Sequence, residues 1–441
     1  MGRTRNVVVG MLLLCALVPS LAVAEEDEED LRTTVEALKQ RLRDQDRRIA
    51  ELEARQATSG PTTVEAQKEQ IKQVVREMRA DKKEGLTTPS WLEGLKLAGD
   101  LRLRYEYNGF NWGATQGSEK KDRNRARYRL RVGVTKTWLD DQLEVGFRLA
   151  SGENNDATST NQSFTQDFSK KPVWIDLAYA KYTPKALKGF SVIGGKMLRP
   201  WLTNEIFFDS DVNPEGFWAE YKVAKVGPVE PFVGAGYFVV NESADGEDST
   251  MYIAQAGVKA DIAKDVKYTL ATNYQEWTDY SASGATPRGN DSPLSRVPGF
   301  RIISLSNNVD FPVFGRPLNV FADVARNCGE GAPTHNYTGQ DNAYAAGIKY
   351  GQNKKKGDWS LKYRYAWVEA DALPGHFVDS DFGFANRKGH VIGGEYSLLD
   401  SLTVGVNVFL TQPVFSPTTT SGSSRTEDMT ATVMADLIWK F

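Results

Sequence analysis

The sequence predicts an all-β fold, a transmembrane antiparallel β-barrel of about 16 strands, preceded by an N-terminal α-helical coiled coil. Three observations predict it. From residue 91 to the end, apolar and polar residues alternate with a period of two, as in strands with two different faces. The connections between these stretches are by turns short and long. A secretory leader stands at the start of the chain.

The leader is predicted over residues 1–24. Arg3 and Arg5 form its basic start, an apolar run of about a dozen residues follows, and Ala22 and Ala24 complete a small-x-small cleavage site. The apolar run is too short to cross a membrane as a helix. We therefore expect cleavage after Ala24, with an uncleaved anchor as the alternative.

A coiled coil is predicted over residues 25–57. Apolar residues recur there at alternating spacings of four and three, at Leu31, Val35, Leu38, Leu42, Ile49 and Leu52. The alternative is a single amphipathic helix packed on another part of the protein. The stretch "TSGPTT" interrupts the pattern, so residues 58–90 are expected to form a second helical segment and a linker.

The barrel itself is predicted over residues 91–441. In "LKLAGDLRLRYEY", Leu101, Leu103 and Tyr105 fall on one face, and Arg102 and Arg104 fall on the other. "YRLRVGV", "LEVGFRLA", "WSLKYRYAW" and "LTVGVNVFL" repeat this pattern. The expected strands are 95–107, 124–138, 142–151, 172–183, 189–196, 216–226, 229–240, 250–262, 266–280, 300–310, 317–326, 342–350, 358–370, 389–398, 402–411 and 429–441.

The connections indicate a membrane barrel. Short turns, such as 140–141, alternate with long segments, such as 152–171, 281–299, 371–388 and 412–428. Short turns at one rim and long loops at the other are typical of outer-membrane barrels. The apolar face of the strands would then face lipid and the charged face the lumen. A soluble β-sandwich is the main alternative, but it has no reason to alternate its loops so regularly.

Five sequence stretches carry a resemblance to a known family. They are "GDLRLRYEY", "RNRARYRLRVGV", "VGFRLASGE", "GGKM" and "DVNPEGFWAEY", in this order. Together they resemble the putative-porin family of Gram-negative bacteria and, more distantly, the phosphate-selective porins O and P. The resemblance covers most of residues 92–441. It implies a passive outer-membrane channel that assembles as a trimer, and the more distant family would imply a preference for anions.

The polar face of the first three strands carries a set of arginines. We expect it to form a basic wall of the pore, because charges that line a low-dielectric tube concentrate ions of opposite sign. The alternative is a scaffold, in which these arginines pair with lumen acids and hold the barrel's shape. The predicted wall consists of Arg102, Arg104, Arg127, Arg129, Arg131 and Arg148.

The connection at 197–215 is predicted to fold inward and narrow the pore, as the third loop does in sixteen-stranded general porins. Its apolar side chains, such as Trp201 and Phe208, favour burial over exposure to water. The acids that would then face the basic wall are Glu205, Asp209, Asp211 and Glu215. A calcium loop is disfavoured, because Pro214 occupies the position where glycine is needed for the sharp turn.

Several function classes are not expected from this sequence. The formal net charge of −3 offers no basic excess for nucleic acid, and the three histidines show no metal-ligand spacing. No Ser-His pair suggests catalysis, so we expect neither an enzyme nor a cofactor. The expected partners are outer-membrane lipid, small hydrophilic solutes or ions, and further copies of the chain. The alternative to a channel is an outer-membrane anchor whose coiled coil, lying in the periplasm, tethers the membrane to a periplasmic partner.

Overall fold

The computed structural model describes residues 94–112, 122–154, 156–297, 299–330, 339–415 and 429–441, together with residues 39, 40, 43, 44 and 47. The chain divides into two compact units, Met1–Thr87 and Thr88–Phe441. The five described residues of the first unit are helical. The expected leader at 1–24 and the segment at 58–90 lie outside the described residues, and the coiled coil at 25–57 stays a prediction.

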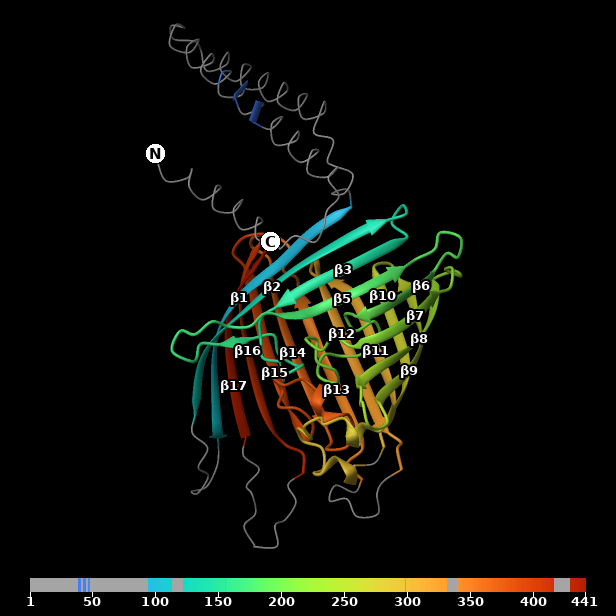
Figure 1. The fold of residues 1–441 in the computed structure, drawn as a ribbon, viewed down its shortest axis with the longest axis vertical. Helices are drawn as coiled ribbons and strands as arrows, with labels where there is room; N and C mark the ends of the chain where they lie inside the picture. Colours follow the sequence, from blue (N-terminus) through green and yellow to red (C-terminus); the bar gives the residue numbers. More distant parts are fainter. Residues whose placement is uncertain are drawn as a thin grey trace. The chain divides into compact units, whose positions relative to one another are not determined.

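The second unit is a β-barrel (Figure 1). Among the described residues it contains a sheet of 17 strands, and all of them except β4 form one closed antiparallel ring, in which β1 pairs with both β2 and β17. The strands are β1 (Leu95–Trp112), β2 (Arg123–Trp138), β3 (Leu143–Ala150), β4 (Gln162–Ser163), β5 (Trp174–Tyr182), β6 (Phe190–Lys196), β7 (Glu215–Lys222), β8 (Val229–Asn241), β9 (Ser249–Ala263), β10 (Val266–Thr278), β11 (Arg301–Val313), β12 (Arg316–Asn327), β13 (Asn342–Gly351), β14 (Trp359–Val368), β15 (Arg387–Ser397), β16 (Leu402–Pro413) and β17 (Met429–Lys440). Three short 3₁₀ helices, η3 (Tyr280–Ala282), η4 (Leu294–Arg296) and η5 (Gly375–Phe377), lie in the long connections.

The outer face of the wall is apolar and the inner face is charged, as a membrane barrel requires. On β1, Leu103 is 45% exposed and Tyr105 is also exposed, whereas Arg104 is buried and Glu106 is only 1% exposed. Apolar side chains therefore point outward, and charged side chains point into the barrel. The predicted all-β closed antiparallel barrel is confirmed. Among the residues that the structure describes, no helix is both long and apolar enough to cross a membrane.

The wall is uneven in height. β1 and β2 have 18 and 16 residues, but β3, β5, β6 and β7 have only 8, 9, 7 and 8. Because β3 pairs with residues 131–138 of β2, it leaves the first half of β2 without that neighbour. The two-residue strand β4 pairs there with Arg127 and Tyr128. The sequence pattern did not predict β4.

Long connections occupy much of the interior of the barrel, and two of them meet there. Residues 197–214, between β6 and β7, and residues 371–386, between β14 and β15, contribute most of their apolar side chains to one buried cluster. Trp201, only 2% exposed, packs edge-on against Phe208 at a ring-centroid distance of 5.1 Å. Phe208 stacks on Phe377 of the other connection at 5.9 Å. The hydrophobic core therefore lies inside the ring, and it joins the two connections.

Candidate functional site

The arginines of the predicted wall lie on inward-facing positions of β1, β2 and β3, and most of them are bound by carboxylates. Arg104 donates to Asp436 on β17 at 2.7 Å and to Asp381 of the 371–386 connection at 3.2 Å. Arg129 donates to Asp100 at 2.8 Å, and Asp100 also accepts from Arg131 at 2.7 Å. These bonds join neighbouring strands across the inner face of the barrel.

The remaining paired arginines follow the same arrangement. Arg127 donates to Glu106 at 3.0 Å, and Arg125 binds the other oxygen of that carboxylate. Arg148 on β3 binds Asp176 on β5. In each case the acid and the base project from adjacent strands, because alternation sends both side chains into the lumen.

Arg102 differs from the other five. It donates to the amide oxygen of Asn161 at 2.6 Å, and its Nε is buried without a hydrogen-bond partner. Within the described part of the chain, no carboxylate lies within ion-pair distance of it. Of the six predicted wall arginines, Arg102 therefore keeps the least compensated charge.

The 197–214 connection crosses the lumen. Its bend begins at Asn204, whose side-chain oxygen accepts from the backbone N–H groups of Ile206 and Phe207 at 3.0 and 2.9 Å. The next acid, Glu205, pairs with Arg364 on β14 at 2.8 Å. The connection starts at β6, and β14 lies diametrically opposite β6 in the ring. The connection therefore reaches from one side of the barrel to the other, where the ion pair between Glu205 and Arg364 holds it.

Asp211 lies against the basic wall. Its carboxylate is 3.9 Å from Arg129 and 3.7 Å from Arg131, and it also accepts from the hydroxyl of Thr160 at 3.3 Å. Glu215 lies elsewhere, as the first residue of β7, where it pairs with Lys196 on β6 at 2.8 Å. The expected acidic set is thus divided: Asp211 lies by the arginines, Glu205 at the opposite wall, and Glu215 in the wall itself.

Asp209 forms a contact that the sequence analysis missed. The motif Asp-Ser-Asp occurs twice, at 209–211 and at 379–381, once in each inward connection. In both copies the first aspartate accepts from the backbone N–H of the second at 2.8 Å. The copies face each other: the N–H of Asp209 donates to the carbonyl of Phe377 at 2.8 Å, and that of Asp379 donates to Ile206 at 3.1 Å. We call this paired arrangement the DSD clamp.

The DSD clamp shifts the ionisation of its own acids. Burial raises the pKa of Asp209 to about 10, and the nearby Asp379 and Asp211 carboxylates raise it as well. Burial also raises the pKa of Asp379, to about 7, with a further contribution from Asp381. Two neighbouring carboxyls that are both withdrawn from bulk water cannot both ionise cheaply. For Glu205, desolvation within the barrel acts to raise the pKa, but Arg364, together with Lys362 and Arg199, outweighs it and holds the pKa below its ordinary value.

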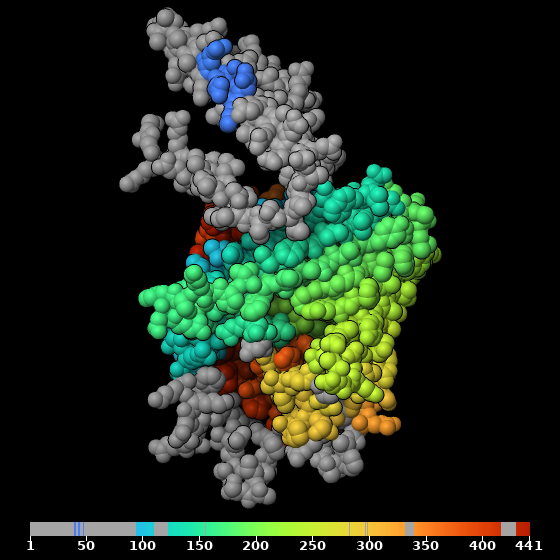
Figure 2. Space-filling model, in the orientation of Figure 1, coloured from blue at the N-terminus to red at the C-terminus, as the bar shows by residue number. Residues whose placement is uncertain are grey.

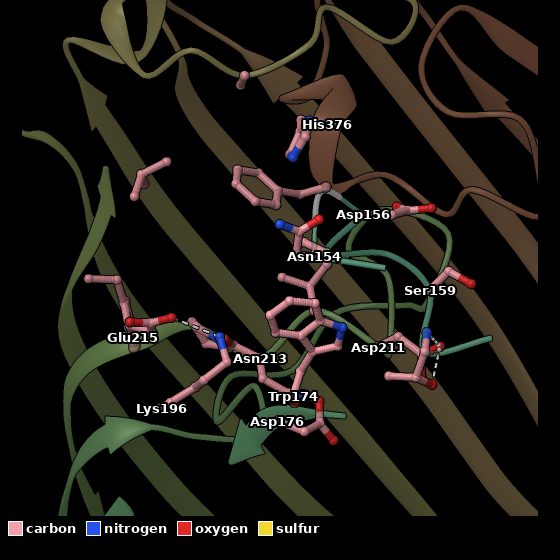
Figure 3. Close-up of a pocket in the computed structure, with 18 of the residues that line it drawn as sticks. Asn154, Asp156, Ser159, Trp174, Asp176, Lys196, Asp211, Asn213, Glu215 and His376 are labelled. Atoms are coloured by element: carbon pink, nitrogen blue, oxygen red, sulfur yellow. Dashed lines mark hydrogen bonds and ion pairs between the residues drawn. The ribbon is translucent and has the colours of Figure 1, made fainter. Parts of the chain in front are cut away.

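Two cavities flank the 197–214 connection, and Asp211 lines both. One, of about 180 Å³, lies against the basic wall and is lined by Arg102, Arg104, Glu205, Asp209, Lys362 and Asp381, among others. The other, of about 460 Å³, is shown in Figure 3, where Trp174, Asn213 and His376 surround the opening from three different segments. The connection is thus a partition between two spaces inside the barrel. Among the described residues, no group of three acidic, histidine or cysteine side chains is arranged to hold a metal ion.

The residues that sequence reasoning missed come mainly from the second half of the chain. Asp381 and Asp436 reach Arg104 from far along the sequence, and the sequence pattern predicts only an ordinary outer loop at 371–388. One signal was present: "FFDSDVN" and "FVDSDFG" share an apolar-Asp-Ser-Asp pattern. A repeated motif of this kind in two loops points to a shared environment.

Comparison with known proteins agrees with this architecture. A family described as putative porin matches residues 114–295 and 299–425. Among solved structures, OprB of Pseudomonas putida, in its high-pH structure, has a TM-score of 0.52 and 13% identity, covering 80% of this chain and 96% of that chain. OmpF of Salmonella typhi, in complex with daunomycin, has a TM-score of 0.47 and 13% identity, covering 79% of this chain and 97% of that chain.

At such low identity, the likeness to OprB shows the barrel fold alone, and the OmpF comparison adds no argument. A comparison with curated proteins gave no match. The family match has a different weight, because it extends over most of the barrel and well over half of the chain. On that ground, the chain belongs to the putative porin family.

Proposed function

We propose that the protein is a passive, water-filled channel of the outer membrane for small hydrophilic solutes or ions. The observation that carries the proposal is the path of residues 197–214. They leave the wall at β6 and reach Arg364 on the opposite side through Glu205 at 2.8 Å. A segment in that position controls the cross-section of any path through the ring, so we assign it the role of the constriction. The DSD clamp fixes this segment to the second inward connection.

The basic wall divides into two roles in this proposal. Arginines with carboxylate partners hold adjacent strands together, since a buried charge is retained when it is paired and hydrogen-bonded. Arg102 lacks such a partner in the described residues and lines the cavity of about 180 Å³ beside the constriction. We assign a modest preference for anions to Arg102 rather than to the arginine set as a whole.

Planar-bilayer recording tests the channel. The purified full chain should give stepwise conductance, and replacing residues 203–211 with a short Gly-Ser linker should raise the size of each step. A protein that inserts but gives no steps would contradict the channel and favour the alternative, an outer-membrane anchor. Steps of unchanged size in the linker variant would contradict the constriction alone. Reversal potential in a salt gradient tests the anion preference.

A further inference from the structure

The larger of the two cavities beside the constriction, of about 460 Å³, is built mainly by the long connections. Its wall includes residues 151–160, 211–214, 283–285 and 376–377, which all lie between strands. Figure 2 shows the surface hollowed on this face, between the green segments near residues 150–215 and the yellow segment near residue 285. The long connections of bacterial barrels face the outside of the cell. A solute that enters from that side therefore reaches this cavity.

The charged side chains in the wall of this cavity are almost all paired. Four ion pairs account for them: Asp156 with Arg288 at 3.1 Å, Lys196 with Glu215 at 2.8 Å, Asp176 with Arg148, and Asp211 with Arg131 at 3.7 Å. Among the described residues of the wall, only the exposed Glu153 has a carboxylate without an ion pair. Desolvation and the nearby Arg288 lower the pKa of His376, so its imidazole adds no charge at neutral pH. A charged solute therefore finds little free counter-charge here, in contrast to the smaller cavity beside Arg102.

Aromatic rings form the apolar part of the wall. The half-buried Phe377 stacks on Phe208 at 5.9 Å and on Trp277 at 5.4 Å, with interplanar angles of 15° and 26°. Trp174, at the start of β5, is 39% exposed, and its indole N–H donates to the carbonyl of Gly152 at 2.9 Å. This bond fixes the orientation of the indole. An accessible aromatic face held in one orientation suits the flat, apolar face of a ring-shaped solute.

Polar side chains occupy the rest of the wall, and two of them have an atom without a hydrogen-bond partner in the described part of the chain. Asn213 is 7% exposed and donates its amide N–H to Asp176 at 2.7 Å. Because a carboxylate only accepts, this bond fixes the amide, and the amide oxygen is left without a partner. The Nδ1 atom of His376 lacks a partner as well (Figure 3). Hydroxyl groups match such unused capacity, because each can both donate and accept.

We propose that this cavity binds a neutral, hydroxyl-rich ring solute, a mono- or disaccharide, on its way to the constriction. The paired charges favour a neutral solute, the aromatic faces favour a ring, and the unused polar atoms favour hydroxyl groups. The volume of about 460 Å³ lies in the range of about 300–1,000 Å³ that is usual for small-molecule sites. The inference names a solute class for the channel proposed above, and it rests on that function for the route of the solute but not for its binding.

Calorimetric titration measures the binding without requiring a channel. The full chain is purified in a detergent without a sugar head group and titrated with glucose, and with glucuronate and glucosamine as its negatively and positively charged counterparts. We expect saturable binding of glucose and binding weaker by about tenfold or more for both charged sugars, since neither charge finds a free partner in the wall. No saturable binding of glucose, or equal or tighter binding of either charged sugar, would overturn the proposal.

Substitutions in the wall locate the site. Ala285→Trp fills the cavity, whereas Ala244→Trp makes the same change in the exposed connection between β8 and β9, outside the cavity. We expect Ala285→Trp to abolish glucose binding and Ala244→Trp to keep the wild-type affinity. Trp174→Leu should weaken binding about tenfold through loss of the aromatic face, and Trp174→Phe should restore most of it. Wild-type affinity in both Ala285→Trp and Trp174→Leu, or equal loss in Ala244→Trp, would overturn the proposal.

Planar-bilayer recording separates this inference from the channel itself. Glucose should reduce the current steps of the wild type in a saturable way, and the reduction should be absent in Ala285→Trp. Steps that glucose leaves unchanged, from a protein that does not bind glucose, would overturn the sugar site and leave the channel intact. Glucose binding by a protein that gives no steps would contradict the channel and support the site.

Discussion

The DSD clamp should weaken as the pH rises, and Asp209→Asn should abolish most of that dependence. Asp209 is 6% exposed, and its carboxylate accepts from the N–H groups of Asp211 and Ser380 at 2.8 and 3.2 Å. Asp379 and Asp381 lie close enough to raise its pKa, while Arg199 from the same connection is attracted to it. The acids therefore outnumber the base around this carboxyl, and protonation relieves their repulsion.

The sign and size of the pH dependence follow from the raised pKa of Asp209. The pKa of Asp209 is about 10 when the clamp is closed, against an ordinary value of 3.8. Between these two pH values, the carboxyl holds its proton in the closed clamp and loses it when the clamp opens. The contribution to stability is complete below the ordinary pKa and is lost as the pH rises towards about 10. One such proton is worth about 1.4 kcal/mol per pH unit, or a tenfold change in the opening equilibrium.

Hydrogen exchange measures this opening, because the N–H groups of Asp209 and Asp379 both donate across the clamp. After correction for the intrinsic rate, their protection should fall about tenfold per pH unit between pH 8 and pH 9, where Asp379, with a pKa of about 7, has already lost its proton and Asp209 has not. In Asp209→Asn the slope should flatten, while the loss of the bond from Ser380 should lower protection at acidic pH by about 1 kcal/mol. Asp245→Asn, a change at an exposed loop acid, serves as the control and should keep the wild-type slope. Equal slopes in wild type and Asp209→Asn would refute the reasoning.

Three further changes separate the parts of the channel. Arg102→Glu reverses the least compensated charge of the wall, so the reversal potential in a salt gradient should move towards cation selectivity; no shift would show that Arg102 does not face the ion path. Trp201→Ala removes a side chain that packs on Phe208 and Phe238, which should cost about 3–5 kcal/mol in urea unfolding and raise the conductance; a stable variant with unchanged conductance would contradict the packed constriction. Deletion of residues 25–85 should leave single-channel conductance intact, and a change in oligomer mass would show that the expected coiled coil assembles subunits.

Much of the barrel could be predicted because alternation is a local signal. The start of β1 at Leu95 and the end of β2 at Trp138 agree with the expected limits, since each strand has two chemically different faces. β4 has only two residues and therefore no period to detect. The sequence predicts a strand from 216 and so places Glu215 in the loop, whereas β7 starts at Glu215. This shift of one residue changes its partner from the lumen arginines to Lys196.

The candidate site could be predicted only in part, because its contacts join distant segments. Alternation places Arg104 on the inner face, but nothing local to it indicates Asp436, which lies 332 residues away. Likewise, apolar residues at 201–208 indicate an inward connection without showing that residues 371–386 accompany it. The pairing of the two Asp-Ser-Asp motifs depends on loop conformations that a one-dimensional pattern does not contain.

The pairing of β1 with β17, which closes the ring, is expected to be a slow step in the protein's assembly. Asp100 to Gly109 pair with Lys440 to Ala431, and Gly99 and Phe441 exchange backbone hydrogen bonds of 2.8 and 3.1 Å. This pairing has the largest sequence separation in the barrel, so it carries a high entropic cost and forms slowly. Until that closure the edges of β1 and β17 stay unpaired. Variants that slow it leave these edges exposed for longer, and the edges are then the places where misassembly with other chains begins.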